Sequence, residues 1–246
     1  MNQNNTAEQH TAGKSVLLHL LPGLLIGLCY FALVPVTSQL GYPSMAALMV
    51  TVMLVLVPFE LGYLFYQGRK ATGRFSLQGV VEYRNRLPVW QYLLWVPVLF
   101  VILAIIFTVM KPVDVFLRDN FFSWIPPLDG GLDGNYSQQA LSVTYLLVGV
   151  FGVIVGPIVE ELYFRGHLLP RMGYAGKWSP LLHSFLFALY HIWTPWMIVT
   201  RTIGTLSLVW AAKRRSLYLS IAVHIAVNTV DFITAIAFIA AMSSQA

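Results

Sequence analysis

The sequence is poor in charged residues and has almost no cysteine. Only 10% of its 246 residues are charged, whereas charged residues make up about a quarter of an ordinary globular chain. Cys29 is the single cysteine, so the chain can form neither an intrachain disulfide nor a clamp of several thiolates around a metal. The sequence also lacks a Gly-rich phosphate loop, a G-x-S-x-G motif and an H-E-x-x-H motif. These are local signatures of nucleotide-binding proteins, serine hydrolases and zinc proteases.

Apolar residues dominate instead. They make up 57% of the chain, and its mean hydropathy is +0.69. A run of about 20 apolar residues is long enough to cross the hydrocarbon core of a bilayer. The sequence therefore predicts an all-α, polytopic membrane helix bundle of about seven (six to eight) transmembrane helices. The predicted spans cover residues 15–34, 44–66, 89–110, 140 to the acidic pair at 160–161, 179–193, 196–212 and 217–242.

The basic residues lie between these spans and predict the orientation of the chain. The net charge is +5, and most Lys and Arg fall in connections on one side of the bundle, the largest group between residues 69 and 86. By the positive-inside rule this side and the N-terminus are cytoplasmic, and the acidic loop over residues 111–139 lies opposite. Such a distribution does not indicate a nucleic-acid partner. The predicted organisation is a polar N-terminal tail (1–14), N-terminal transmembrane helices and loops (15–139) and a catalytic core (140–242).

Two adjacent glutamates end the fourth apolar run. Glu160 and Glu161 follow it directly, and Arg165 comes four residues after Glu161. On a helix, Glu161 and Arg165 share one face and can pair, while Glu160 points roughly 100° away. Ionisable groups at membrane depth are costly, and they tend to face a protein interior or a watery cavity where they function. Glu160 is therefore a candidate catalytic residue, with Glu161 and Arg165 as supports.

Two later spans add histidine and asparagine. His191 follows Phe187 by four residues on the fifth span, and His224 and Asn228 are four residues apart on the seventh. Each pair therefore projects from one helical face. Counted at 1.5 Å per residue from the predicted cytoplasmic ends, these groups and Glu160 lie at overlapping depths. The sequence predicts that they form one polar site built from three helices.

Four further polar residues rank below this set. Asp231 lies three residues after the asparagine and is predicted to hold that asparagine or the preceding histidine in place. Glu60 and His183 are predicted to lie at the membrane interface, near the ends of their spans. Arg201 is predicted to extend its side chain from the start of the sixth span towards water.

Glutamate, histidine and asparagine together suit the hydrolysis of an amide. A carboxylate in a low-dielectric pocket can serve as a general base near neutral pH, histidine can orient a water molecule, and an amide N–H₂ can stabilise an oxyanion. Alternatively, Glu160, His191 and His224 could bind zinc, because two histidines and one carboxylate leave an open position for water. The residue types are the same in both versions, so the cofactor is predicted as either none or zinc.

The three motifs, taken in order, resemble those of the CPBP intramembrane proteases, which include type II CAAX prenyl endopeptidases and bacteriocin-processing or abortive-infection-type proteins. The resemblance covers about residues 140–235 and includes the segment Ser216–Ile221 before His224. It implies Glu160 and His191 as the water-activating pair, and His224 with Asn228 as the oxyanion-binding or supporting pair. It also implies a multi-pass protein of the membrane, in a bacterial cell, with a membrane-associated peptide or protein as substrate.

The predicted function is therefore an intramembrane endopeptidase embedded in the lipid bilayer. The alternative is a catalytically inactive membrane scaffold or immunity protein with the same fold. A transporter that relays protons through the same side chains is less favoured, because transporters often contain repeated halves and this sequence shows no repeat.

Overall fold

Helices form all of the regular structure in residues 8–83 and 86–243, which are the residues that the computed structural model describes. Within these residues, five helical stretches are long and apolar enough to cross a membrane. They coincide with five of the predicted spans, and the remaining two predicted spans are also helical. The prediction of an all-α, polytopic membrane bundle is confirmed. Arg84, part of the predicted basic group, and the first half of the predicted N-terminal tail (residues 1–7) lie outside the described residues.

The five long stretches are mostly longer than predicted, and several change their winding along their length. Segments wound as π or 3₁₀ helix are labelled η. The stretches are α1 (Ala12–Gln39); α2 (Ser44–Thr51) with η1 (Val52–Leu61) and α3 (Gly62–Thr72); α4 (Val89–Phe121); α5 (Gln138–Leu147) with η2 (Val148–Val155), α6 (Gly156–Glu160), η3 (Glu161–Leu168) and η4 (Leu169–Arg171); and α9 (Leu217–Ser243).

The predicted fifth and sixth spans form a shorter helical pair. The fifth is α7 (Ser179–Tyr190), which follows η5 (Gly173–Trp178). The sixth comprises η6 (Pro195–Met197), α8 (Ile198–Trp210) and η7 (Ala211–Arg215). With 12 and 13 residues, α7 and α8 are each shorter than the roughly 20 residues that a full crossing needs. They pack against each other, and the chain reverses between them near Pro195.

The predicted loop over residues 111–139 is shorter than the sequence suggested. α4 continues through Pro112 to Phe121, so only residues 122–137 connect it to α5. The hydroxyl of Thr200 on α8 donates a hydrogen bond of 2.5 Å to the Asp114 carboxylate. This contact ties the end of α4 to the α7–α8 pair, and its partner lies 86 residues away in the sequence.

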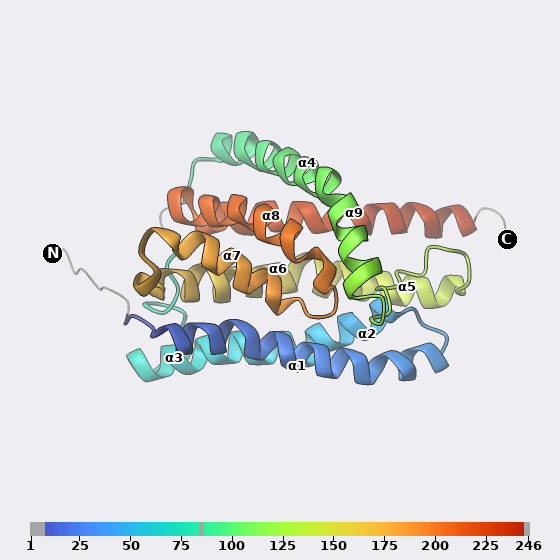
Figure 1. Cartoon of the computed structure of the whole chain (residues 1–246), viewed down its shortest axis with the longest axis horizontal. Coiled ribbons are helices and arrows are strands. Elements are labelled where there is room, and N and C mark those ends of the chain that lie inside the picture. The colour runs from blue at the N-terminus through green and yellow to red at the C-terminus, as the bar shows by residue number, and fades with distance from the viewer. Residues whose placement is uncertain (1–7, 84–85, 244–246) are drawn as a thin grey trace.

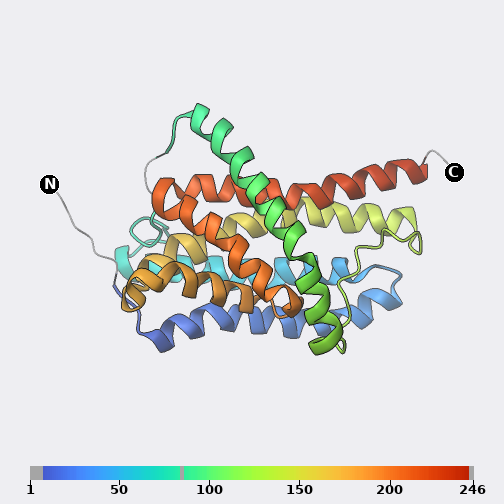
Figure 2. The same ribbon diagram turned by 45° about the horizontal axis from the view of Figure 1, so that its top comes forward.

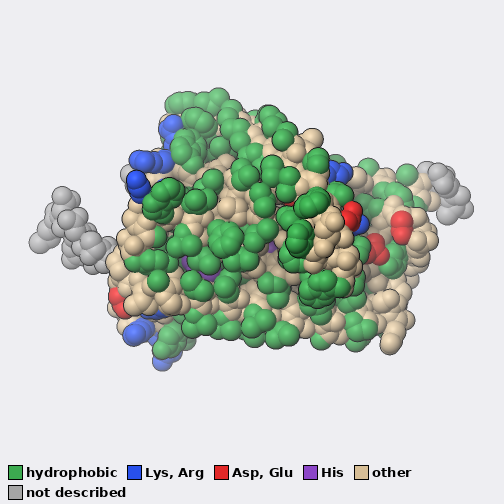
Figure 3. All heavy atoms as spheres, in the orientation of Figure 1, with side chains coloured by type: hydrophobic (Ala, Val, Ile, Leu, Met, Phe, Trp, Pro, Cys, Tyr) green, Lys and Arg blue, Asp and Glu red, His purple; other side chains and the backbone are tan. Residues whose placement is uncertain are grey.

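The long helices run roughly along one axis, and α4 crosses them obliquely (Figures 1 and 2). α1 packs beside α2 and η1 on one side and against α7 on another, while α4 covers α8 and α9. α1 begins and α9 ends at opposite ends of the bundle (Figure 1). Most of the visible Lys and Arg side chains gather at the end where α1 begins, and acidic side chains are most visible at the other end (Figure 3). Apolar side chains cover the flank between them, which suits contact with lipid.

The close approach of α1 to α7 depends on glycine. A Cβ atom added at Gly23 would collide with the backbone carbonyl oxygen of Tyr190 at the end of α7. One helical turn later, a Cβ at Gly27 would collide with the side chain of Ile192. Because Tyr190 immediately precedes His191, these glycines allow α1 to pack against the segment that carries a candidate catalytic residue.

We therefore predict that Gly23→Ala destabilises the protein, by about 1–3 kcal/mol, because the added methyl group would push a backbone carbonyl that cannot rotate away. Gly13→Ala is the matched control in the same helix, where nothing lies within 4 Å of the position that the added methyl group would take. This control should leave the stability unchanged or raise it slightly, since alanine is the better helix former. Thermal unfolding in detergent measures both variants. Equal unfolding temperatures for the two would contradict the proposed packing constraint.

Candidate active site

The two adjacent glutamates are buried at the junction of α6 and η3. Glu160 is 7% exposed and Glu161 is fully buried. Both belong to the continuous helical stretch that ends at Arg171. At 1.5 Å per residue, Glu160 therefore lies roughly 16 Å from that end, deeper than the sequence alone suggested. The pair is thus an interior feature of the bundle, and its two carboxylates have different partners.

Glu161 is the centre of a buried ion cluster. Its Oε1 lies 3.2 Å from Nη1 of Arg165 and 2.9 Å from Nδ1 of His224. Its Oε2 accepts a hydrogen bond of 2.5 Å from the Ser220 hydroxyl. The Arg165 guanidinium lies over the ring of Phe187, with its central carbon 3.8 Å from the ring centroid. The Glu161 carboxylate is therefore held by Arg165, His224 and Ser220, and the Arg165 guanidinium by this carboxylate and the ring of Phe187.

Glu160 faces both candidate histidines. Its Oε1 lies 3.9 Å from Nε2 of His191, and its Oε2 lies 3.8 Å from Nε2 of His224. The chain thus brings together three of the four predicted catalytic side chains, from α6, from the residue after α7 and from α9. Both distances are too long for a direct hydrogen bond and short enough for one water molecule to bridge.

The other nitrogen of each imidazole is held by a hydrogen bond that sets its tautomer. Nδ1 of His191 lies 2.9 Å from the carbonyl oxygen of Phe187. A carbonyl oxygen can only accept, so this Nδ1 carries the proton and Nε2 is left with a lone pair. Nδ1 of His224 is similarly directed at the Glu161 carboxylate. Each Nε2 is therefore oriented towards Glu160 by a partner on its far side.

Asn228 lies one helical turn beyond His224 and is anchored to the backbone. Its Nδ2 donates a hydrogen bond of 2.9 Å to the carbonyl oxygen of Gly152 in η2. This bond uses one of the two amide hydrogens. The second hydrogen remains available for another acceptor.

Asp231 does not take the supporting position predicted for it. Its side chain is exposed on α9, and within the described part of the chain it makes no hydrogen bond or ion pair. Asn228 is held by a backbone carbonyl and His224 by Glu161, so neither needs it. Residues three and seven apart lie on nearly the same helical face, so the exposure of Asp231 comes from its place about 10 Å further along α9 than His224 and not from its direction around the helix.

Two residues predicted to be interfacial are fully buried. Glu60 in η1 and His183 in α7 have no exposed surface. Oε1 of Glu60 accepts a hydrogen bond of 3.0 Å from the hydroxyl of Tyr190, and this hydroxyl also interacts with Glu160. Glu60 therefore belongs to the surroundings of the candidate site. Its signal in the sequence was a carboxylate within an apolar span, a residue type that is functional by default at membrane depth.

His183 pairs with a residue that the sequence did not single out. Its Nδ1 lies 3.0 Å from Nε2 of His19 on α1, and Nδ1 of His19 lies 2.7 Å from the carbonyl oxygen of Ser15. This pair joins α7 to α1 inside the bundle.

Arg201, predicted to extend towards water, instead donates a hydrogen bond of 3.1 Å to the carbonyl oxygen of Thr194. Thr194 directly precedes η6, so the contact lies where the chain turns from α7 into α8. The guanidinium therefore stabilises this reversal of the chain.

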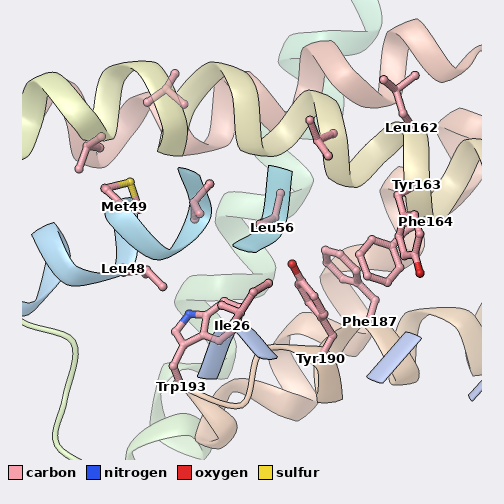
Figure 4. Close-up of a cluster of buried hydrophobic side chains, with 14 of the residues drawn as sticks. Ile26, Leu48, Met49, Leu56, Leu162, Tyr163, Phe164, Phe187, Tyr190 and Trp193 are labelled. Carbon is pink, nitrogen blue, oxygen red and sulfur yellow. The ribbon is translucent and has the colours of Figure 1, made fainter. Parts of the chain in front are cut away.

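Aromatic rings form one wall of the site. Phe164, Phe187 and Tyr190 meet with ring centroids 4.9–5.8 Å apart, and the ring of His191 packs at 4.8 Å from both Phe187 and Tyr190. Figure 4 shows the aromatic side chains from α7 directed at those of η3. The wall limits the freedom of the imidazole and lowers the local dielectric constant, which strengthens the electrostatic interactions within the site.

The residue types of the site suit zinc, but their spacing does not. Two imidazole nitrogens and a carboxylate are common zinc ligands. Among residues 8–83 and 86–243, however, no group of three His, Cys, Asp or Glu side chains lies close enough together to hold a metal ion. The Nε2–oxygen distances of 3.8 and 3.9 Å also exceed the ~3.4 Å expected between tetrahedral zinc ligands.

Part of this chain matches a known protein family. Residues 142–230 match the family model described as "Type II CAAX prenyl endopeptidase Rce1-like". No curated protein and no solved structure matches the chain. The matched segment contains Glu160, His191, His224 and Asn228, together with the Glu161–Arg165 pair, and it excludes Glu60 and Asp231. The match confirms, over residues 142–230, the resemblance to CPBP intramembrane proteases drawn from the three motifs.

Proposed function

We propose that the protein is an endopeptidase that hydrolyses a peptide bond of a membrane-associated peptide or protein, with Glu160 as the general base. One observation carries the proposal. The Nε2 atoms of His191 and His224 face the Glu160 carboxylate at 3.9 and 3.8 Å, and a hydrogen bond at Nδ1 fixes the orientation of each ring. One water molecule can bridge these groups. The match of residues 142–230 to a protease family supports the same activity.

In the first step, the Glu160 carboxylate takes a proton from this water as the water oxygen bonds to the substrate carbonyl carbon. The lone pair on Nε2 of His191 accepts the second water hydrogen as a hydrogen bond and so orients the attack. The electron pair of the C=O bond moves to oxygen. The free amide hydrogen of Asn228 can donate to this oxyanion, while the contact of Nδ1 with Glu161 keeps the His224 imidazole directed at the Glu160 carboxylate that now holds the proton.

In the second step, the carbon–nitrogen bond breaks and its electron pair moves to nitrogen, which takes the proton held by Glu160. The new carboxylic acid then gives up its own proton, so the products are a carboxylate and an ammonium group. Glu160 returns to its starting state. The substrate forms no covalent bond to the protein in these steps.

The position of the site supports a membrane-associated substrate. Glu160 lies roughly 16 Å along its span from the basic end, between helices whose outer faces are apolar. A substrate must therefore enter the bundle from the membrane or from the predicted cytoplasmic surface. A prenylated CAAX protein, the substrate that the description "CAAX prenyl endopeptidase" indicates for the family, is one substrate that meets this requirement.

Glu160→Gln tests the general base. We expect kcat to fall by about 10²–10⁴-fold, the usual contribution of a positioned base, with the unfolding temperature preserved because glutamine has nearly the same shape. Asp119→Asn, at an exposed position near the end of α4, is the matched control and should keep wild-type activity. The assay follows cleavage of a membrane-anchored reporter peptide and new peptide termini in the membrane fraction of cells. Full activity of purified Glu160→Gln protein would refute the proposal. If neither the wild-type protein nor Glu160→Gln cleaved the reporter and the cellular phenotype were the same with both, the protein would be a catalytically inactive membrane scaffold.

Glu161→Gln tests the orienting cluster. This substitution leaves the buried Arg165 without its counter-ion, so we expect a loss of about 3–5 kcal/mol in the free energy of unfolding and a lower kcat, because His224 loses the anion that sets its tautomer. Ser220→Ala removes one hydrogen bond from the same carboxylate and should cost only about 1 kcal/mol, with activity largely retained. Chemical denaturation and steady-state kinetics measure the two effects. Similar losses of stability and activity in Glu161→Gln and Ser220→Ala would contradict the central role of the Glu161 charge.

Metal dependence separates the two versions of the chemistry. The water-based mechanism predicts that dialysis against a strong chelator leaves the cleavage rate within about twofold of the untreated protein, and that purified protein contains no stoichiometric zinc by elemental analysis. Loss of activity on chelation, with recovery on adding zinc, would show that the three side chains close around a metal.

A further inference from the structure

A cavity of about 420 Å³ lies at the basic end of the bundle, separate from the candidate active site. It is bounded by the start of α1, the end of α3, the segment that follows α3, and η3 with η4. Three of the five candidate membrane spans therefore begin or end beside it, at Ala12, Thr72 and Arg171. This is the level at which lipid headgroups meet a spanning protein. Lys and Arg side chains gather on this end of the molecule (Figure 3).

Three buried polar side chains line the cavity. His10, His167 and Arg171 are 5%, 3% and 7% exposed. Nδ1 of His10 and Nε2 of His167 have no hydrogen-bond partner within the described residues, although both atoms are shielded from solvent. Unpaired polar groups at such positions are costly. A ligand that supplies their partners would recover this cost.

The cavity contains donors suited to an anion. Arg171 uses Nη1 for a hydrogen bond of 2.7 Å to the carbonyl oxygen of His167, which leaves further N–H groups on a guanidinium that has five in total. Lys14 adds an ammonium group from the first turn of α1. Burial, followed by the positive charges of Lys14 and Arg171, lowers the pKa of His10 to about 4, so this ring is neutral at pH 7 and feels a positive potential. A phosphate group fits these donors.

The cavity also contains acceptors suited to a cation. Nδ1 of His167 lies 2.9 Å from the carbonyl oxygen of Val80. That nitrogen therefore carries the proton, and the unpartnered Nε2 can only accept. Glu8 and Glu82 line the same cavity and add two carboxylates. Glu8 already lies 4.0 Å from the Lys14 ammonium. An anion alone would leave Nε2 of His167 unpaired, whereas an ammonium group with N–H donors would satisfy it and meet the Glu82 carboxylate.

We propose that this cavity binds a phosphoethanolamine group, with its phosphate on Arg171 and Lys14 and its ammonium on His167 and Glu82. The charges of the ligand and of the lining residues are complementary, because its phosphate meets two cationic side chains and its ammonium meets the carboxylates. The position at the ends of three spans favours the headgroup of phosphatidylethanolamine as the source. A soluble phosphoethanolamine ester presents the same chemistry.

Native mass spectrometry of delipidated protein in detergent tests this site with four lipids that share the same acyl chains: phosphatidylethanolamine, phosphatidylcholine, phosphatidylglycerol and diacylglycerol. Phosphatidylethanolamine should bind at least about tenfold more tightly than the others, because phosphatidylcholine has no N–H donor, phosphatidylglycerol has no ammonium and diacylglycerol has no phosphate. Equal binding of all four lipids would overturn the proposal.

Three variants assign the two halves of the ligand. Arg171→Gln and Lys14→Gln should weaken phosphatidylethanolamine and phosphatidylglycerol together, by about tenfold, while Glu82→Gln should weaken only phosphatidylethanolamine. Lys70→Gln is the matched control, since Lys70 is exposed at the same end of the bundle and does not line the cavity. Lys14 and Glu82 are exposed, so their variants remain informative if Arg171→Gln fails to fold. Binding by Lys14→Gln and Glu82→Gln that equals that of Lys70→Gln would refute the site.

A competition experiment identifies the source of the headgroup. Glycerophosphoethanolamine, added as a soluble probe, should displace phosphatidylethanolamine only at concentrations well above those of the lipid if the membrane supplies the ligand. Displacement at equal concentration would support the site with a soluble ester as its ligand. Failure to displace the lipid at any concentration would show that the acyl chains alone hold it, which would contradict headgroup recognition.

Discussion

The candidate site depends on the buried contact of Glu161 with Arg165 and His224. Charges inside a membrane protein persist only where partners compensate for the loss of water. Here one carboxylate meets a guanidinium at 3.2 Å, an imidazole at 2.9 Å and the Ser220 hydroxyl at 2.5 Å. These contacts join η3 to α9, so the same interaction that satisfies the charges also fixes the helix that carries His224 and Asn228.

Adjacent identical residues acquire different roles through this arrangement. Glu161 is surrounded by donors, and its oxygens are occupied. Glu160, one position earlier and about 100° around the helix, has histidine nitrogens at 3.8–3.9 Å and no donor of comparable strength. A carboxylate with an unoccupied lone pair is the one able to take a proton from a substrate water. The contacts of Glu161 therefore leave the Glu160 carboxylate available as a proton acceptor.

Polar groups extend further through the interior than the four predicted catalytic residues. Glu60 and Tyr190 join Glu160 to the second span, and aromatic rings separate these groups from lipid. At the basic end, a second polar region around His10 and Arg171 contacts the ends of three spans. Because lipid cannot satisfy such groups, both regions depend on partners within the protein or on groups that enter from outside it.

The sequence alone determined the membrane class, the helical stretches and the residue types of the site. Apolar runs of spanning length and motifs at four-residue spacing are local properties, so they can be read without knowing how the helices pack. The i,i+4 spacing of Glu161 and Arg165 also predicted a pair that needs only one helix to form. These features follow from covalent order and helical geometry.

Only the tertiary structure decided which polar groups meet. In the part of α4 that extends beyond the predicted span, Asp114 accepts a hydrogen bond from Thr200, 86 positions away. Glu60, predicted at the membrane interface, is buried, and Asp231, predicted within the site, is exposed. Burial depends on which neighbouring helix covers a face, and the periodicity of a single helix does not specify that neighbour. The orientation of each imidazole likewise depends on contacts at its far nitrogen. Such contacts join residues distant in sequence, and their energies are decided when the helices pack.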